Sequence, residues 1–198
     1  MIMCSKITTQ NFPPVPDQSI TVSETHPLRS FALTHFLWNR RIPLIVAQQF
    51  CREAIYYVGE KAFYAVAFPN DAGGYTLLNR YHEITAGPQA PTLLTWGNPQ
   101  LAVFNHFLDL LTLVAHLPAY TRLPDFLVLP DAGQTEYIPK HYAHLHLFLR
   151  NDPKGQLGAQ IAARTTNRLI DHRALYRGYA SLNDWACHIG QRPPDHPG

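Results

Sequence analysis

The stretch Leu145-His-Leu-Phe-Leu-Arg150-Asn-Asp152-Pro-Lys154-Gly155 decides how we interpret the fold of this chain. Its apolar first half is typical of a buried β-strand, and the polar turn after it predicts the start of a helix. A second stretch, Leu101-Ala-Val-Phe-Asn105-His106-Phe-Leu-Asp109-Leu-Leu-Thr112, repeats the pattern of an apolar strand that leads into a helix. Both stretches place polar groups just beyond the carboxyl end of a strand, where open α/β sheets form their binding sites.

The second half of the chain alternates short apolar segments with helical patterns. We predict strands over 93–96, 101–104, 126–129, 145–149 and 175–176, and helices over 107–116, 157–171 and 182–188. Strands that alternate with helices indicate a parallel sheet with helices on its faces. The predicted fold class is therefore α/β.

The first half of the chain shows a different pattern of predicted elements. Residues 1–25 are polar and rich in proline, which predicts an extended N-terminal arm. Residues 26–92 are expected to form a small helical and β-hairpin segment, with helices from 27 and from 43 to about 54, a hairpin over 55–68, a third strand over 75–78 and a loop over 81–92. The α/β domain then covers 93–190, and 191–198 form a flexible tail.

Composition narrows the protein class. The 198 residues are 46% hydrophobic and 15% charged, which is typical of a globular chain, and the net charge of +2 is too small to indicate a nucleic-acid binder by itself. The three cysteines are far apart and form no CxxC pair, which favours a reduced, cytoplasmic protein without a cysteine-ligated zinc. No signal-peptide core and no apolar run of membrane-spanning length is present, so we expect no membrane association.

Several segments, in order, resemble the Toprim domain of primase-like proteins found on plasmids and conjugative elements. Residues 26–79 resemble the lead-in segment of such proteins, 103–109 fall where the family carries Glu-Gly-x-x-Asp, 147–155 where it carries Asp-x-Asp and a Gly, and 182–185 resemble its closing motif. The resemblance implies a Toprim-like parallel sheet flanked by helices and preceded by a helical and hairpin segment. The zinc-binding module that usually precedes this segment has no counterpart here.

The acidic residues that the family uses for catalysis are incomplete. The resemblance implies a Glu that acts as general acid or base and two Asp residues that help to hold Mg²⁺. In this chain the Glu position is Asn105, the first Asp position is Arg150, and Asp109 and Asp152 are retained. Asn cannot ionise and Arg repels a cation. We therefore expect a pseudoenzyme with a degenerate active site, no catalytic residue, no metal and no cofactor.

Arg150 has three interpretations. It pairs with Asp152 or Asp109 in the space of the missing metal, it receives a phosphate, or it is a solvated turn residue. His106 occupies the glycine position of the motif, and we favour a structural role over proton transfer. We expect His144 and His146 to be solvated or hydrogen-bonded side chains and not metal ligands.

Basic residues are concentrated near the second motif. Residues 150–178 contain six Lys or Arg against two Asp or Glu, whereas residues 1–149 contain nine against ten. This patch predicts DNA or RNA binding by a group of five residues: Arg150, Lys154, Arg164, Arg168 and Arg173. A protein of a replication, mobile-element or defence system is an alternative partner.

Two other functions remain open at this stage. One is a primase- or nuclease-like enzyme whose Mg²⁺ is held by Asp109, Asp152 and Asp131, although the sequence Pro-Asp-Ala-Gly makes Asp131 more typical of a turn. The other is a protein-interaction scaffold that binds no nucleic acid. Fold analogy alone does not choose among these functions.

Overall fold

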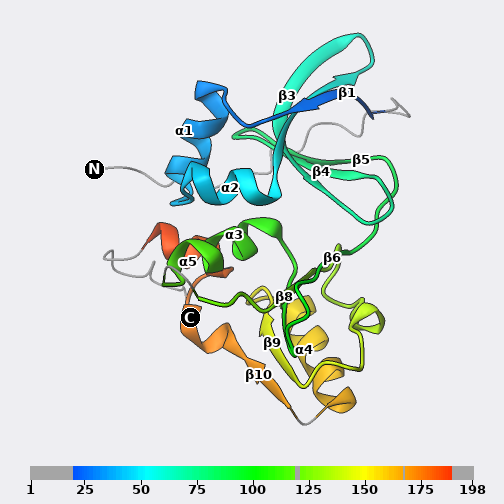
Figure 1. Ribbon diagram of the computed structural model, residues 1–198, viewed down its shortest axis with the longest axis vertical. Coiled ribbons are helices and arrows are strands. Elements are labelled where there is room, and N and C mark those ends of the chain that lie inside the picture. The colour runs from blue at the N-terminus through cyan, green and yellow to red at the C-terminus, as the bar shows by residue number, and fades with distance from the viewer. Residues whose placement is uncertain (1–19, 119–120, 167, 189–198) are drawn as a thin grey trace. The chain divides into compact units, whose positions relative to one another are not determined.

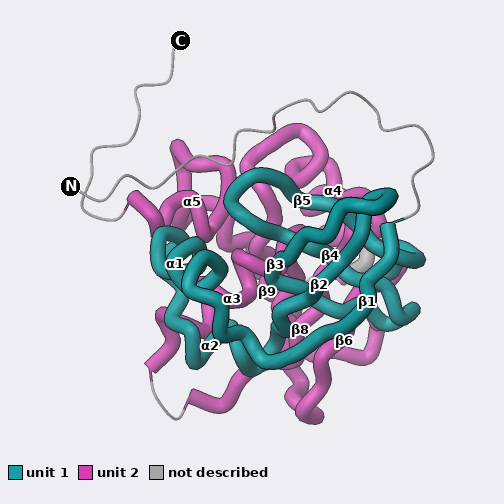
Figure 2. Tube along the Cα trace, turned by 90° about the horizontal axis from the view of Figure 1, so that it is seen from above, with its two compact units in different colours: residues 1–90 teal, residues 91–198 magenta. Residues whose placement is uncertain are grey.

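The computed structural model describes residues 20–118, 121–166 and 168–188. The chain divides into two compact units, residues 1–90 and 91–198, which Figure 2 colours separately. Among the described residues, no helix is long and apolar enough to cross a membrane.

The first unit is a five-stranded antiparallel sheet with two helices (Figure 1). Its elements are β1 (Ile20–His26), α1 (Phe31–Asn39), α2 (Leu44–Phe50), β2 (Arg52–Val58), β3 (Lys61–Pro69), β4 (Tyr75–Leu78) and β5 (Glu83–Ala86). The strands follow one another in sequence order across the sheet. Alternate residues of β2 and β3, such as Tyr56 and Ala65, face one shared apolar core, as the two-residue period of a strand requires.

The start of α1 is fixed by a carboxylate from β2. Glu53 accepts hydrogen bonds from the backbone N–H groups of Arg29 and Ser30, at 3.1 and 3.0 Å, and from the Ser30 hydroxyl. Burial raises the pKa of Glu53, but the hydrogen bonds from Ser30 and Arg29 outweigh it and hold the pKa below its usual value. The carboxylate thus takes the place of a side-chain cap and joins the helix to the sheet.

The hairpin and the third strand are confirmed in this unit, but three predictions were wrong. Residues 20–25 of the predicted arm belong to β1, which pairs with β2 on both sides of a bulge at Ser23, whereas residues 1–19 of the arm and the predicted tail 191–198 lie outside the described residues. The second helix ends at Phe50 instead of about 54, because Arg52 already pairs in β2. The predicted loop 81–92 contains β5, which pairs with β4.

The second unit is a five-stranded sheet, mostly parallel, with helices on both faces. Its elements are β6 (Thr92–Leu94), β7 (Gln100–Phe104), α3 (Phe107–His116), β8 (Asp125–Val128), the 3-10 helix η1 (Thr135–Tyr137), β9 (His144–Phe148), α4 (Pro153–Thr165), β10 (Leu169–Asp171), the 3-10 helix η2 (His172–Tyr176) and α5 (Leu182–Cys187). The strand order is β10-β9-β7-β8-β6, and only β6 runs antiparallel to its neighbour. The predicted α/β class, with a parallel sheet flanked by helices, is confirmed.

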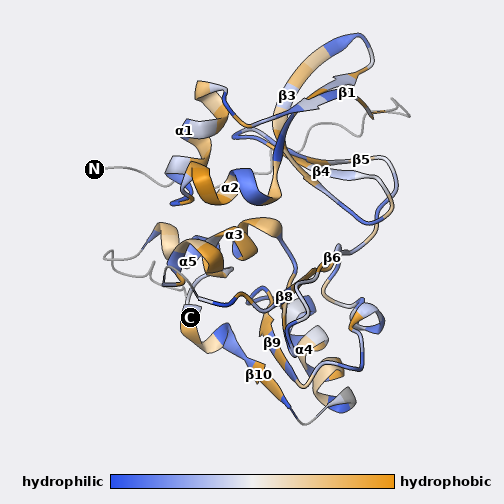
Figure 3. Cartoon of the chain, viewed as in Figure 1, coloured by the Kyte–Doolittle hydropathy of each residue, from blue (hydrophilic) through white to orange (hydrophobic). Residues whose placement is uncertain are grey.

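Each face of this sheet has its own apolar layer. Figure 1 places α3 and α5 on one face and α4 on the other, and Figure 3 shows that α3 and β9 are largely hydrophobic. Val103 and Leu147 pack with Ala159 and Ala162 of α4. Phe104 of the opposite face stacks on Phe148 at 5.3 Å between ring centroids. Burial on both faces explains the continuous apolar runs that the sequence shows.

Two element boundaries differ from the prediction here. The helix expected over 157–171 runs from Pro153 to Thr165, since Pro is favoured in the first turn and Asp152 caps the N-terminus. Residues 169–171 form β10, and the strand expected at 175–176 belongs to the 3-10 helix η2.

Candidate functional site at the carboxyl edge of the parallel strands

The strand order creates a switch point between β7 and β9. From β7 the chain crosses through α3 to β8 on one side, and then returns to β9 and β10 on the other side of β7. The loops after β7 and β9 therefore diverge from two adjacent strand ends, and Phe104 and Phe148 are register partners there. Open α/β sheets bind ligands at such a point, which makes this edge the candidate site.

Asn105 and Arg150 meet at this edge. The side-chain Oδ1 of Asn105 accepts a hydrogen bond from the backbone N–H of Arg150 at 3.2 Å. The Asn105 Nδ2 is buried and has no hydrogen-bond partner among the described residues. The Asn105 side chain thus links the β7 loop to the β9 loop.

Arg150 forms the predicted ion pair with Asp152. Its Nε lies 3.2 Å from Oδ2 of Asp152, and both side chains are partly exposed, at 47% and 38%. The other oxygen of Asp152 accepts from the N–H of Gly155 at 2.8 Å and so caps α4. One carboxylate therefore holds both the guanidinium and the start of the helix.

Gly155 permits a very close approach between α4 and the β9 loop. A Cβ atom at this position would lie 2.0 Å from the carbonyl oxygen of Arg150. Only glycine fits at such a distance, which gives the glycine of this motif a packing role.

Asp109 is buried inside the domain. It is 1% exposed, and its Oδ1 accepts from the N–H of Asn183 in α5 at 2.7 Å. The Asn183 side chain in turn donates to Thr112 at 2.7 Å. Burial raises the pKa of Asp109, opposed by nearby positive charge and by hydrogen bonds from Asn183 and Ser181. Asp109 thus joins α3 to α5.

His106 and Asp131 also have structural roles. His106 caps α3, and its Nδ1 accepts from the N–H of Leu108 at 3.0 Å. Asp131 accepts from the N–H of Gly133 at 2.8 Å, which confirms the predicted turn, and its other oxygen pairs with Lys154 at 2.9 Å. The Asp131 carboxylate thus forms an ion pair with a lysine of α4.

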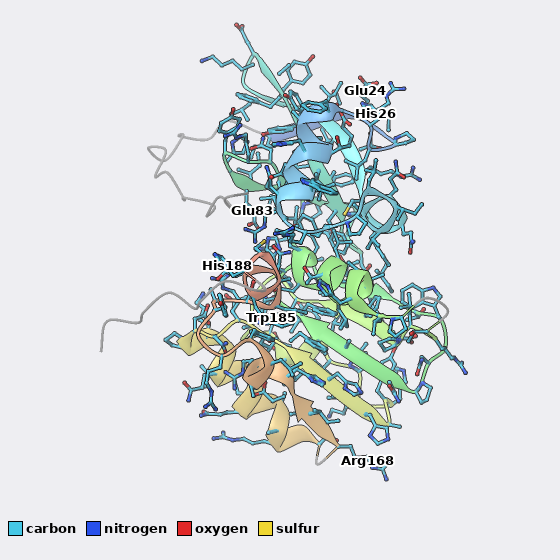
Figure 4. The ribbon with its side chains drawn as sticks, turned by 90° about the vertical axis from the view of Figure 1, so that its left-hand side faces the viewer. Glu24, His26, Glu83, Arg168, Trp185 and His188 are labelled. Carbon is cyan, nitrogen blue, oxygen red and sulfur yellow. The ribbon has the colours of Figure 1, made fainter. Side chains whose placement is uncertain are left out.

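The five residues of the predicted basic patch have different surroundings. Arg150 and Lys154 are paired with carboxylates at the edge, and Arg173 forms a two-point ion pair with Asp171, with contacts of 3.0 and 2.7 Å. Arg164 lies in the last turn of α4, and the Arg168 side chain projects away from the ribbon in Figure 4. Arg150, Lys154 and Arg173 follow the carboxyl end of β9 or β10, whereas Arg164 lies at the C-terminal end of α4 and Arg168 precedes the amino end of β10.

Two features of the site were not found from the sequence. Asn151 follows Arg150, and its side-chain amide donates to the carbonyl oxygens of Tyr176 and Tyr179, both at 3.0 Å. His146 Nδ1 lies 3.0 Å from His172 Nε2, so His146 is hydrogen-bonded, as predicted, but to a histidine 26 residues away. Both contacts depend on the pairing of β10 with β9, and no local sequence pattern predicts that pairing.

The carboxylates do not converge on one point. In the described part of the chain, no three His, Cys, Asp or Glu side chains form a group that is able to hold a metal ion. Asp109, Asp131 and Asp152 are each engaged by donors of the chain itself.

Comparisons with known proteins bear on the fold of the chain. A model for a "Domain of unknown function (DUF8464)" matches residues 22–87. No curated protein matches the chain. The primase fragment of the bacteriophage T7 primase-helicase protein is similar in structure, with a TM-score of 0.51, 15% identity, and coverage of 87% of this chain and 77% of that one.

A second solved structure gives the same result. It contains the bacteriophage T7 lagging-strand DNA polymerase interacting with primase domains of two gp4 subunits bound to an RNA/DNA hybrid and dTTP. The matched chain has a TM-score of 0.50 and 18% identity, and the match covers 72% of this chain and 79% of that one. Both comparisons show that this chain has a primase-like fold, in agreement with the resemblance seen in the sequence.

Proposed function

We propose that this chain is a catalytically degenerate, primase-like module that binds nucleic acid at the carboxyl edge of its second sheet. The proposal rests on the hydrogen-bond contacts of the Arg150 guanidinium at the switch point between β7 and β9. Its guanidinium is held through Nε by Asp152, and the two terminal nitrogens have no hydrogen-bond partner among the described residues. A half-exposed guanidinium with free terminal nitrogens is suited to a phosphate.

The surroundings of Arg150 favour an anionic ligand. Lys154 is well exposed, at 76% of its side chain, and lies in the first turn of α4. The N-terminus of a helix carries partial positive charge, which adds to the charge of these two side chains. A phosphate backbone that follows this edge therefore finds two exposed cations, each paired on one side with a carboxylate, and the N-terminus of α4.

The same residues do not fit a divalent metal ion. Mg²⁺ requires several free oxygen ligands in a near-octahedral arrangement. Asp109 is buried against α5, Asp131 is paired with Lys154, and Asp152 is shared between Arg150 and the N-terminus of α4. We therefore derive no catalytic step through a metal, and binding is the proposed role.

The comparison with a structure that contains an RNA/DNA hybrid supports nucleic acid as the class of ligand. A biological context in a mobile-element, replication or defence system is part of the proposal and comes from the sequence resemblance. A protein partner of such a system is the outcome to pursue if nucleic acid does not bind.

Fluorescence anisotropy tests this proposal. Labelled single- and double-stranded DNA and RNA are titrated with the full chain in EDTA and then in Mg²⁺, at several salt concentrations. We expect binding that weakens with salt and does not require Mg²⁺. Arg150→Ala weakens binding to all sequences and lowers the salt slope by about one, the effect of one lost phosphate contact.

Arg122→Ala is the matched control, because Arg122 is exposed and precedes β8, at the opposite edge of the sheet. It removes the same charge and should change binding much less than Arg150→Ala. Equal losses in the two variants would reduce the effect to net charge and contradict a site at Arg150. Binding that requires Mg²⁺, or a metal-dependent activity that Asp152→Ala abolishes, would support the enzyme alternative and overturn the proposal.

A further inference from the structure

The exposed side of α1 carries aromatic residues instead of charged ones. Phe31 and Trp38 are 82% and 63% exposed, and both are among the most exposed large apolar side chains of the described chain. They lie seven residues apart with His35 between them, so the three side chains follow one side of the helix. The rings of Phe31 and His35 stack, with 5.8 Å between their centroids. We call Phe31, His35 and Trp38 the α1 ridge.

The other side of α1 is apolar as well. It carries three buried residues: Leu33, Phe36 and Leu37. A helix that is apolar all round is normally covered all round, whereas an ordinary surface helix turns charged residues to water. Between Arg29 and Arg40 the chain has no Asp, Glu, Lys or Arg. The α1 ridge therefore has the composition of a surface that another molecule covers.

An arginine stands where the end of α1 favours glycine. The N–H groups of Arg41 and Ile42 donate to the carbonyl oxygens of Trp38 and Leu37, at 2.9 and 3.0 Å, which is the hydrogen-bond pattern of a Schellman motif. The motif requires a left-handed residue, and Arg41 has a φ of +59°, the only positive φ of a non-glycine residue in the described chain. Glycine adopts this conformation without strain and arginine does not. The role of Arg41 therefore lies in its side chain and not in its backbone.

Both ends of the α1 ridge are positively charged. Arg29 precedes α1 and Arg41 follows it, both are exposed, and neither side chain has an ion-pair partner among the described residues. Residues 27–52 contain four arginines and no Asp or Glu, and the Glu53 carboxylate is buried and already binds the start of α1. An uncharged aromatic ridge between two guanidinium groups is complementary to an apolar surface that has carboxylates at both ends.

We propose that the α1 ridge binds an acidic amphipathic helix of a partner protein. Apolar side chains of the partner pack on Phe31 and Trp38, and its Asp or Glu side chains pair with Arg29 and Arg41. The ridge suits a helix, because residues at i, i+4 and i+7 form a row that fits the groove of a second helix. Tryptophan and arginine are also enriched among the residues that carry most of the binding energy of protein interfaces. The surface belongs to the first unit and takes no part in binding at Arg150, so the inference goes beyond the proposed function.

Three other occupants fit this surface less well. A nucleic-acid backbone is charged at every nucleotide, whereas α1 offers no charged side chain between Arg29 and Arg40. A helix that lies on a membrane carries Lys and Arg along its polar face, and α1 has neither within its nine residues. A second copy of the chain, paired antiparallel through α1, would bring Arg29 of one copy beside Arg41 of the other, where like charges repel.

A model peptide tests the proposal with the full chain. Fluorescence anisotropy follows a labelled peptide of about 18 residues, roughly 27 Å long as a helix, with Leu along one side and Glu along the other. One control peptide replaces every Glu by Lys, and a second scrambles the sequence so that the apolar side is lost. We expect saturable binding of the acidic peptide and binding about tenfold weaker or more for each control, because the charge and the apolar side are both required.

Variants of the chain locate the site. Trp38→Ala and Phe31→Ala should each weaken binding of the acidic peptide by about fivefold or more, whereas Leu175→Ala, which removes a side chain of similar exposure (61%) in the second unit, should leave it unchanged. Arg41→Gly should weaken binding by about threefold without lowering the Tm, because glycine suits the left-handed position. Arg122→Ala is the charge-matched control and should bind the peptide like the parent chain. Circular dichroism checks that each variant is folded.

No saturable binding of the acidic peptide, equal binding of the Lys peptide, or undiminished binding by Trp38→Ala would overturn the proposal. A dimer of the parent chain in sedimentation that Trp38→Ala dissociates would make a second copy the occupant instead, and adsorption to phosphatidylglycerol vesicles that Trp38→Ala abolishes would make it a membrane. Arg150→Ala should bind the peptide like the parent chain, and Trp38→Ala should bind nucleic acid like the parent chain. The failure of one proposal is thereby distinguished from the failure of the other.

Discussion

Gly155→Ala is a small change that should disturb the candidate site strongly. The added Cβ would lie 2.0 Å from the carbonyl oxygen of Arg150 and 3.0 Å from its carbonyl carbon. Backbone atoms cannot rotate away as a side chain can, so α4 or the β9 loop has to move by about 1 Å to reach the shortest ordinary contact. That movement displaces the residue that we propose as the phosphate ligand.

Two effects of opposite sign set the size of the change in stability. Replacing glycine by alanine inside a helix gains up to about 1 kcal/mol, and less in the first turn, where Gly155 lies. Overpacking of a rigid contact costs about 1–3 kcal/mol or more. We expect a net loss of roughly 1–2 kcal/mol in the free energy of unfolding, equivalent to a fall in Tm of about 2–8 °C for a domain of this size.

Thermal and urea denaturation measure this loss, and anisotropy measures binding at Arg150. Gln160→Ala is the control, because Gln160 is exposed in the same helix and its replacement should be nearly neutral. A Gly155→Ala protein that is as stable as the parent and binds nucleic acid equally well would refute the close approach of α4 to the β9 loop.

The other predictions concern buried titratable groups. Asp109→Ala should lower the free energy of unfolding at pH 7 by about 1–3 kcal/mol, because it leaves the Asn183 N–H buried without an acceptor. Asp109→Asn keeps an acceptor and should lower the free energy of unfolding less. Equal losses for the two variants in urea denaturation would contradict this reasoning. Burial lowers the pKa of both His146 and His172, so the fold favours their neutral forms. Histidines of the unfolded chain take up protons below about pH 6.5, and the free energy of unfolding should therefore decrease as the pH falls below that value. Melting curves between pH 7.5 and 5.5 should show a smaller pH dependence for His146→Gln than for the exposed His144→Gln, and identical dependences would argue against the histidine pair.

Much of the second unit was predictable from local sequence. The apolar runs before Asn105 and Arg150 identified β7 and β9, because strands buried on both faces are hydrophobic without alternation. The glycine and the polar turn after Arg150 located the start of α4 to within a few residues. An ion pair of Arg150 with Asp152 or Asp109 was one of three interpretations of Arg150, and the structure shows the pair with Asp152.

The features that were missed depend on partners distant in sequence. The strand β1 looks like a polar arm because it lies at the edge of its sheet, and only its pairing with β2 makes it a strand. The three residues of β10 are too few to show a period, and their structure comes from β9. The hydrogen bonds of Asn151 to Tyr176 and Tyr179, and the burial of Asp109, likewise depend on residues that only the folded sheet brings together.

The bond from Asn183 to Asp109 also bears on how the domain is completed during synthesis. It spans 74 residues, and the Asn183–Thr112 bond spans 71, so the last helix closes on the first helix of the domain. Closing such a long loop is slow compared with local helix formation. During synthesis, the Asp109 carboxylate gains its Asn183 partner only after α5 has emerged from the ribosome. A chain that ends before Ser181 would therefore lack the contacts of Asn183 with Asp109 and Thr112, and we expect it to be less stable than the full chain.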